Sequence, residues 1–138
     1  MRPHCITLQA YGAFAGVQVV DFDQLEDNRL FQISGPTGSG KTTILDGICF
    51  ALFDEASGHD RSGSDMRSDH AQPSLETRVT MDFSVGTKQY RVTRAPTQPR
   101  PKKKGGEGFT NQSANAVLWD RTGVSHPDQE GVVLESKT

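Results

Sequence analysis

The chain has 138 residues, of which 33% are hydrophobic and 23% are charged. This length and balance suit one folded domain with a core, and they exclude a grossly disordered chain. No apolar run approaches the roughly 20 residues of a membrane span, and residues 1–7 lack the apolar stretch of a signal peptide. We therefore expect a cytoplasmic protein without membrane contact. The net charge of −2 gives no general attraction to nucleic acid.

The beginning of the chain predicts an antiparallel pair of strands. Residues 5–9 alternate apolar and polar side chains, and residues 17–22 form a second run that is typical of a strand. Glycines within residues 11–16 supply the turn between the two runs.

A short strand and a glycine-rich loop are predicted next. Residues 30–34 are mostly apolar and end at a glycine, which indicates a buried strand. Residues 35–43 then match the pattern G-x-x-x-x-G-K-[ST]. The glycines allow the backbone to curl until successive N–H groups converge on one anion. Lys41 can reach the outer phosphates of a nucleoside triphosphate, and the Thr42 hydroxyl can ligate Mg²⁺.

The pattern predicts that the chain binds ATP with magnesium. The residues expected to contact the phosphates are Gly35, Pro36, Thr37, Gly38, Ser39, Gly40, Lys41, Thr42 and Thr43.

A helix is predicted over residues 41–53, where apolar residues recur at helical spacing. A strand, a glycine loop and a helix in this order are what the motif requires. Lys41 lies in the first turn, where the helix macrodipole disfavours a cation unless an anion is bound. This context favours a phosphate-binding loop over a glycine-rich turn with an unrelated lysine. The apolar positions surround the helix widely, which favours packing between a sheet and another layer.

The second half of the chain predicts a hairpin after a long polar segment. Residues 56–73 are polar, and a loop of this length is usually functional or mobile. Residues 77–85 alternate cleanly, residues 86–87 form a turn, and residues 88–94 return as a second strand.

Residues 95–115 predict a flexible basic loop, because prolines, glycines and a charge run gather there. Lys102, Lys103 and Lys104 could contact DNA phosphates, and a solvated loop is the alternative interpretation. A strand is expected over residues 116–119, with Trp119 in the core, and the rest of the chain is expected to be a mostly polar tail.

The cysteines and histidines suggest no further chemistry. We expect Cys5 and Cys49 to be reduced and buried. His59 and His70 are more typical of surface histidines than of zinc ligands, because no cysteine or carboxylate pattern accompanies them.

Several stretches together resemble one known family. Residues 35–53 closely resemble the beginning of the bacterial SbcC family, the ATPase subunits of SbcCD DNA nucleases and relatives of SMC proteins. Residues 1–14, 66–71 and 90–103 are similar to the same family. The resemblance extends over residues 1–119, far beyond the phosphate loop.

The resemblance implies an α/β fold: the N-terminal lobe of an ABC-type P-loop ATPase head, with antiparallel hairpins beside the phosphate-loop strand and helix. Residues 1–138 would form this lobe without its coiled coil or C-terminal lobe. Residues 66–71 would lie near the base or ribose of ATP. The implied partners are a C-terminal lobe of the same protein, a second ATPase head in an ATP-dependent dimer, DNA and an SbcD-like nuclease. The implied function is control of DNA-end processing in repair and recombination.

Residues that complete ATP hydrolysis have no convincing position in the chain. Hydrolysis needs an acid to hold Mg²⁺ and a group that orients the attacking water. The run ending at Asp21 resembles a Walker B strand, but Walker B normally follows the phosphate loop, and residues 132–135 are too short a run. We therefore expect binding here and catalysis only in a longer protein. The alternatives are an SMC-like DNA-tethering protein and a kinase or transporter ATPase that shares only the phosphate loop.

Overall fold

The structure is a computed structural model that describes residues 1–25, 30–58, 63–102 and 108–137. Its main feature is a six-stranded sheet with the strand order β2-β1-β3-β4-β7-β8, in which each neighbouring pair is antiparallel. The strands of this sheet are β1 (Arg2–Tyr11), β2 (Phe14–Asp21), β3 (Arg78–Val85), β4 (Lys88–Ala95), β7 (Asn115–Asp120) and β8 (Val132–Lys137). The other elements are helix α1 (Lys41–Phe53), the short 3-10 helices η1 (Asp23–Leu25) and η2 (Gly63–Met66), and a small hairpin of β5 (Gln98–Pro101) and β6 (Phe109–Gln112).

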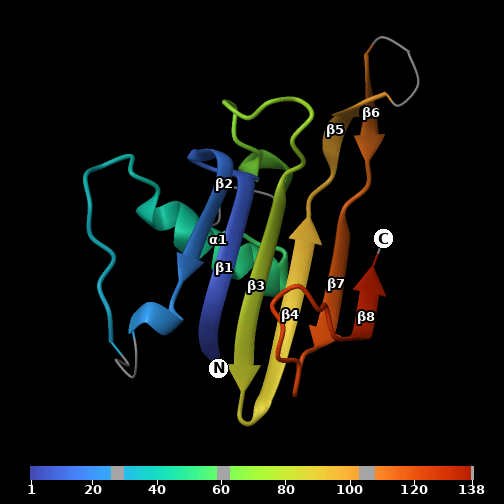
Figure 1. Cartoon of the computed structure of the whole chain (residues 1–138). Helices are drawn as coiled ribbons and strands as arrows, with labels where there is room; N and C mark the ends of the chain where they lie inside the picture. The colour runs from blue at the N-terminus through green and yellow to red at the C-terminus, as the bar shows by residue number, and fades with distance from the viewer. Residues whose placement is uncertain (26–29, 59–62, 103–107, 138) are drawn as a thin grey trace.

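The core lies between α1 and one face of the sheet, and Figure 1 shows the helix crossing behind the strands. Alternation puts Ile6 and Leu8 of β1 on this face, and Ile6 is the register partner of Met81, which in turn pairs with Val92. The helix contributes Phe50, whose ring lies 5.7 Å from that of Tyr11. Burying a side chain of this kind contributes roughly 1.5–3 kcal/mol. The packed face of the sheet therefore sets the position of the helix.

The opposite face of the sheet is largely polar. Thr80 and Thr93 are cross-strand partners whose hydroxyl oxygens are 3.1 Å apart. Asp82 and Arg91 form an ion pair on the same face. An antiparallel sheet with one packed and one polar face shows this alternation in its strands.

The two predicted antiparallel pairs and the predicted helix are confirmed. Strand β1 pairs with β2, and β3 pairs with β4. Helix α1 spans Lys41–Phe53, as the apolar spacing predicts. Trp119 is buried, as expected.

The predicted strand over residues 30–34 is wrong. These residues have no strand geometry, and Leu30 is 92% exposed. A strand needs a neighbour that accepts and donates its backbone hydrogen bonds, and none of the described strands pairs with this segment. Phe31 instead packs its ring 5.7 Å from that of Phe22.

Two segments expected to be irregular form strands. Within residues 95–115, β5 and β6 pair in register from Gln98↔Gln112 to Pro101↔Phe109. Prolines are tolerated there because a two-stranded hairpin consists of edge strands. The expected polar tail contains β8, which pairs with β7 although its side chains are exposed.

The outer face of α1 carries exposed apolar side chains, among them Leu45 at 51% and Phe53 at 68% exposure. Within the described ranges, the second layer that the wide apolar pattern predicts does not cover these two residues. No helix in the described residues is long and apolar enough to cross a membrane.

Candidate functional site

The glycine loop leads directly into α1 and packs against β2. Gly40 is the residue before the helix and has a φ of +87°, a conformation that L side chains rarely adopt. A Cβ on Gly40 would lie 2.5 Å from Cζ of Phe14. Gly40 offers no side-chain cap to the N-terminal N–H groups of the helix. The first turn can therefore offer these groups to an anion.

Lys41 closes back over the loop. Its Nζ donates hydrogen bonds to the carbonyl oxygens of Gly35, at 2.8 Å, and Pro36, at 2.7 Å. The ammonium is thereby held beside the loop, and both hydrogen bonds are exposed. An anion arriving at the helix start would meet a cation that is already in place.

A cleft of about 970 Å³ lies at this end of the helix. The predicted site residues that line it are Thr37, Gly38, Gly40, Lys41, Thr42 and Thr43, whereas Gly35, Pro36 and Ser39 are not among its lining residues. The remaining lining residues are Gly12, Ala13, Asp46, Ala56, Ser57, Gly58, Asp65, Arg67 and Asp69. The structure therefore brings four separate parts of the chain around one opening.

The end of β1 holds the segment of residues 65–69 against this cleft. The N–H of Gly12 donates to the Met66 carbonyl at 2.7 Å, and the N–H of Ser68 donates to the Ala10 carbonyl at 3.0 Å. An isolated bridge joins Tyr11 to Arg67 between these bonds. The segment thus pairs with the last residues of β1 and reaches the same cleft as the glycine loop.

Asp46 is a lining residue that the sequence analysis missed. It is 5% exposed and lies one helical turn after Thr42. Its Oδ1 accepts hydrogen bonds from the Ser57 backbone N–H at 3.0 Å and from the Ser57 hydroxyl. The sequence does carry a signal for Asp46. It is the one acidic residue of α1, and it lies four positions after Thr42, on the same side of the helix.

Thr42 and Asp46 are the cleft residues on α1 that could take part in holding a cation. The described residues contain no group of three His, Cys, Asp or Glu side chains that could hold a metal ion. Mg²⁺ usually keeps several waters and binds through few protein ligands together with substrate phosphates. The residues present fit a magnesium ion that arrives with a polyphosphate.

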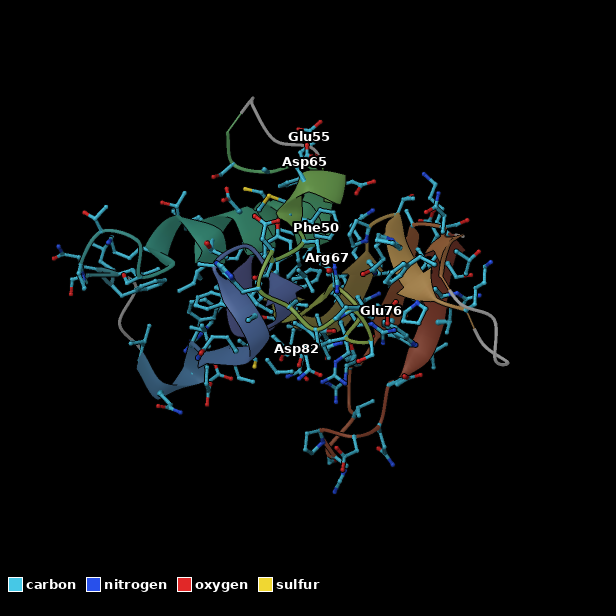
Figure 2. All side chains as sticks on the ribbon, turned by 90° about the horizontal axis from the view of Figure 1, so that it is seen from above. Phe50, Glu55, Asp65, Arg67, Glu76 and Asp82 are labelled. Atoms are coloured by element: carbon cyan, nitrogen blue, oxygen red, sulfur yellow. The ribbon has the colours of Figure 1, made fainter. Side chains whose placement is uncertain are left out.

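Arg67 is held firmly at the wall of the cleft. Its Nη1 donates to the Leu75 carbonyl at 2.8 Å and to the Thr77 hydroxyl at 2.9 Å, and its Nη2 donates to the Gln72 carbonyl at 2.9 Å. In Figure 2, Arg67 lies between Asp65 and Glu76. These bonds hold residues 72–77 around one guanidinium group.

Of the predicted DNA-contact residues, Lys102 does not line the cleft. Lys102 is exposed at the end of β5, and its N–H donates to the Gly108 carbonyl at 3.2 Å. Lys103 and Lys104 lie outside the described residues, as does His59. His70 is exposed.

A second charged cluster lies on the far side of the sheet from α1, where Figure 2 labels Asp82. The carboxylate of Asp82 accepts from Arg91 Nε at 2.7 Å and Nη2 at 2.8 Å, and from Arg121 Nη1 at 3.2 Å. The bond to Asp82 raises the pKa of Arg91. Arg91 and Arg121 both donate to the Pro127 carbonyl. The cluster therefore attaches residues 121–127 to the sheet.

Both cysteines are free, as expected for reduced thiols, but they are half-buried rather than buried. Burial, followed by the charges of Asp82 and Asp21, raises the pKa of the Cys5 thiol.

The fold and the glycine loop indicate a nucleotide-binding ATPase domain, and the comparison of families agrees. Residues 5–126 match the family described as AAA domain, and the chain belongs to this family.

Curated relatives make the similarity more specific. The chain is 48% identical over 118 residues to the SbcC subunit of the SbcCD nuclease of Vibrio cholerae, covering 86% of this chain and 12% of the relative. It is 39% identical over 135 residues to the SbcC subunit of Staphylococcus haemolyticus, covering 98% of this chain and 12% of the relative. The SbcC subunit of Treponema pallidum is 34% identical over 142 residues, covering 97% of this chain and 13% of that protein. The resemblance to the SbcC family is thus confirmed, and the chain spans about an eighth of the length of these relatives.

Proposed function

We propose that the chain binds ATP together with Mg²⁺ in the cleft at the start of α1. The observation that carries the proposal is that Lys41 and Thr42 face the same cleft as the segment of residues 65–69. The loop and the first turn of α1 would hold the phosphates, with Lys41 at the outer phosphates. Thr42 would ligate the magnesium ion.

Each remaining part of the cleft has a role in this proposal. Residues 65–69, at the end of β1, would lie beside the ribose or base. Asp46 would orient a water of the magnesium shell, because its carboxylate is fixed by Ser57. Gly35, Pro36 and Ser39 would shape the loop and hold Lys41, since the amine already bonds to the first two of these residues.

We further propose that residues 1–138 form the N-terminal lobe of an ABC-type ATPase head in an SbcC-like protein. The identity of 34–48% to SbcC subunits supports this proposal. The whole protein would control the processing of DNA ends by an SbcD-like nuclease in repair and recombination. The exposed apolar residues Leu45 and Phe53 on α1 suit a surface that a C-terminal lobe covers. That lobe and a second ATPase head would supply the groups that complete hydrolysis. The cytoplasmic location expected from the sequence stays a prediction.

The test of binding is the thermal unfolding of the 138-residue chain with and without Mg-ATP. Binding to the folded state at a hundredfold excess over Kd stabilises it by about 2.7 kcal/mol, so Tm should rise by several degrees. Lys41→Ala should remove this shift. Lys88→Ala is the matched control, because Lys88 is an exposed lysine that does not line the cleft. This variant should keep the rise in Tm. An unmodified chain whose Tm does not respond to Mg-ATP would refute the proposal.

A further inference from the structure

Gln98 is a buried polar residue at the first position of β5. It is 3% exposed. Its Oε1 accepts a hydrogen bond from the Thr77 N–H at 2.6 Å, and its Nε2 donates to the Thr77 carbonyl at 2.9 Å. The side-chain amide therefore pairs in both directions with the backbone of one residue, as a neighbouring strand would. Removing it would leave both of those buried backbone groups without their partner, which is costly inside a protein.

The same amide also contacts Arg67. Gln98 Oε1 accepts from Arg67 Nη1 at 3.3 Å, and that nitrogen also donates to the hydroxyl of Thr77. The Thr77 hydroxyl in turn donates to the Ala10 carbonyl at 3.1 Å. Gln98 thus belongs to the network that holds the side chain of Arg67, a residue that lines the cleft.

On its other side, Gln98 belongs to the β5–β6 hairpin. Its register partner is Gln112, and the strand continues to the exposed residues Arg100 and Pro101. A separate cavity of about 540 Å³ lies between residues 65–73 and the hairpin residues Pro99 and Phe109. The hydrogen bond from Arg67 to Gln98 therefore joins the hairpin to Arg67 beside this open space.

We propose that Gln98 is a positioning residue of the nucleotide cleft, and that through Arg67 it couples nucleotide binding to the β5–β6 hairpin. This inference rests on the proposed function, because it assigns the cleft to a nucleotide. Gln98 itself does not line the cleft and acts by holding Arg67. Coupling between two sites is reciprocal, so a nucleotide that binds beside Arg67 also stabilises the hairpin.

The first experiment measures the affinity of the 138-residue chain for Mg-ATP by calorimetry. Gln98→Met keeps the length of the side chain and removes its amide, and it should weaken binding roughly five- to tenfold, the lower range of typical couplings. Gln98→Glu keeps an acceptor for Arg67 and for the Thr77 N–H but loses the donor to the Thr77 carbonyl, so it should recover only part of the affinity.

Gln112→Met is the matched control, because Gln112 is the register partner in the same hairpin and its Nε2 donates to Glu76 instead. This variant should bind within about twofold of the unmodified chain, well below typical coupling factors. Equal affinity of Gln98→Met and the unmodified chain would overturn the inference, as would an equal loss in Gln112→Met.

The second experiment is hydrogen exchange, which reports on the hairpin directly. Mg-ATP should slow exchange at the Thr77 amide and at the paired amides of β5 and β6 in the unmodified chain. In Gln98→Glu, which keeps the acceptor for the Thr77 N–H but loses the hydrogen bond to the Thr77 carbonyl, the protection of the hairpin should be smaller. Nucleotide binding without any change in hairpin exchange would overturn the coupling while leaving the proposed function intact. If the unmodified chain does not bind Mg-ATP, the proposed function fails and the coupling fails with it.

Discussion

The backbone of Gly40 lies directly against the ring of Phe14, so closely that a Cβ would come within 2.5 Å of Cζ. This contact places the end of the glycine loop on β2, the strand at the edge of the sheet. The direction in which α1 leaves the loop therefore depends on a residue that precedes the loop by more than twenty positions in the sequence. This contact and the φ of +87° explain why a side chain at this position of the motif would be strained.

Substituting Gly40 tests this contact. Gly40→Ala should destabilise the chain by about 2–4 kcal/mol, the sum of a left-handed backbone and overpacking. Gly38→Ala is the control, because Gly38 has a similar φ of +84° but nothing within 4 Å of the added methyl group. The control should cost only about 1–2 kcal/mol. Urea unfolding measures both losses of free energy. Equal losses would show that the Phe14 ring moves aside without cost, which would contradict the prediction.

The carboxylate of Asp82 should stabilise the fold more than other surface carboxylates do. Asp82→Asn keeps the shape and leaves Arg91 and Arg121, whose side chains are 18% and 11% exposed, without their counter-charge. We expect a loss of about 1–3 kcal/mol in urea unfolding at pH 7.

Asp54→Asn is the matched control for this change. Asp54 is 58% exposed and lies 3.4 Å from Arg94. Its removal should cost less than about 1 kcal/mol, as for most exposed ion pairs. If Asp54→Asn loses as much unfolding free energy as Asp82→Asn, burial does not strengthen the ion pairs of Asp82, and the prediction is wrong.

The raised pKa of the Cys5 thiol predicts that the stability of the fold falls at alkaline pH. Its pKa is raised above the ordinary value of 9.0 by burial, then by Asp82 and Asp21. Below that value both folded and unfolded chains keep the proton, so the stability is fully present. As pH rises further, the unfolded chain loses the proton first, and this part of the stability is lost up to the folded pKa.

Alkylation of Cys5 measures this shift. The pH at which the alkylation rate is half-maximal should be higher in the folded chain than in the chain unfolded by urea, when the modified peptides are quantified by mass spectrometry. The difference should shrink in Asp82→Asn. An identical midpoint in folded and unfolded chains would contradict the prediction.

The basic run of residues 102–104 predicts a contribution to DNA binding by the complete SbcC-like protein. Replacing Lys102, Lys103 and Lys104 with alanine should weaken binding and flatten its salt dependence by roughly 0.9 for each phosphate that is no longer neutralised. Replacing Arg78, Lys88 and Lys137 in the main sheet removes the same charge and should change the salt slope less. Fluorescence anisotropy of a labelled duplex at several salt concentrations measures both, and an unchanged slope in the first variant would exclude the interaction.

The glycine loop and the helix after it were predictable because their signals are local. The helical spacing after Lys41 and the alternation of β3 and β4 are periodicities that a single segment displays by itself. The residue types that hold phosphates and magnesium also stand at fixed distances in the sequence. Lys41 and Thr42 both line one cleft, and their contact with phosphates and magnesium stays a prediction.

The strand assignments that failed depend on a partner. Residues 30–34 have a strand-like composition, but they have no neighbouring strand in the described structure, whereas the exposed residues of β8 pair with β7. Whether a segment becomes a strand is decided by hydrogen bonds to another part of the chain.

The sequence by itself therefore determined the β3–β4 hairpin, helix α1 and the phosphate-loop motif, because each is specified by residues close together in the chain. Only the tertiary structure decided that residues 65–69 and Asp46 line the cleft, and that Gln98 contacts Arg67 across 31 positions. These relationships arise where the end of β1, the helix and the hairpin meet. The hydrophobic periodicity of a single segment cannot predict contacts between segments so far apart. Such contacts depend on how the whole sheet pairs and packs.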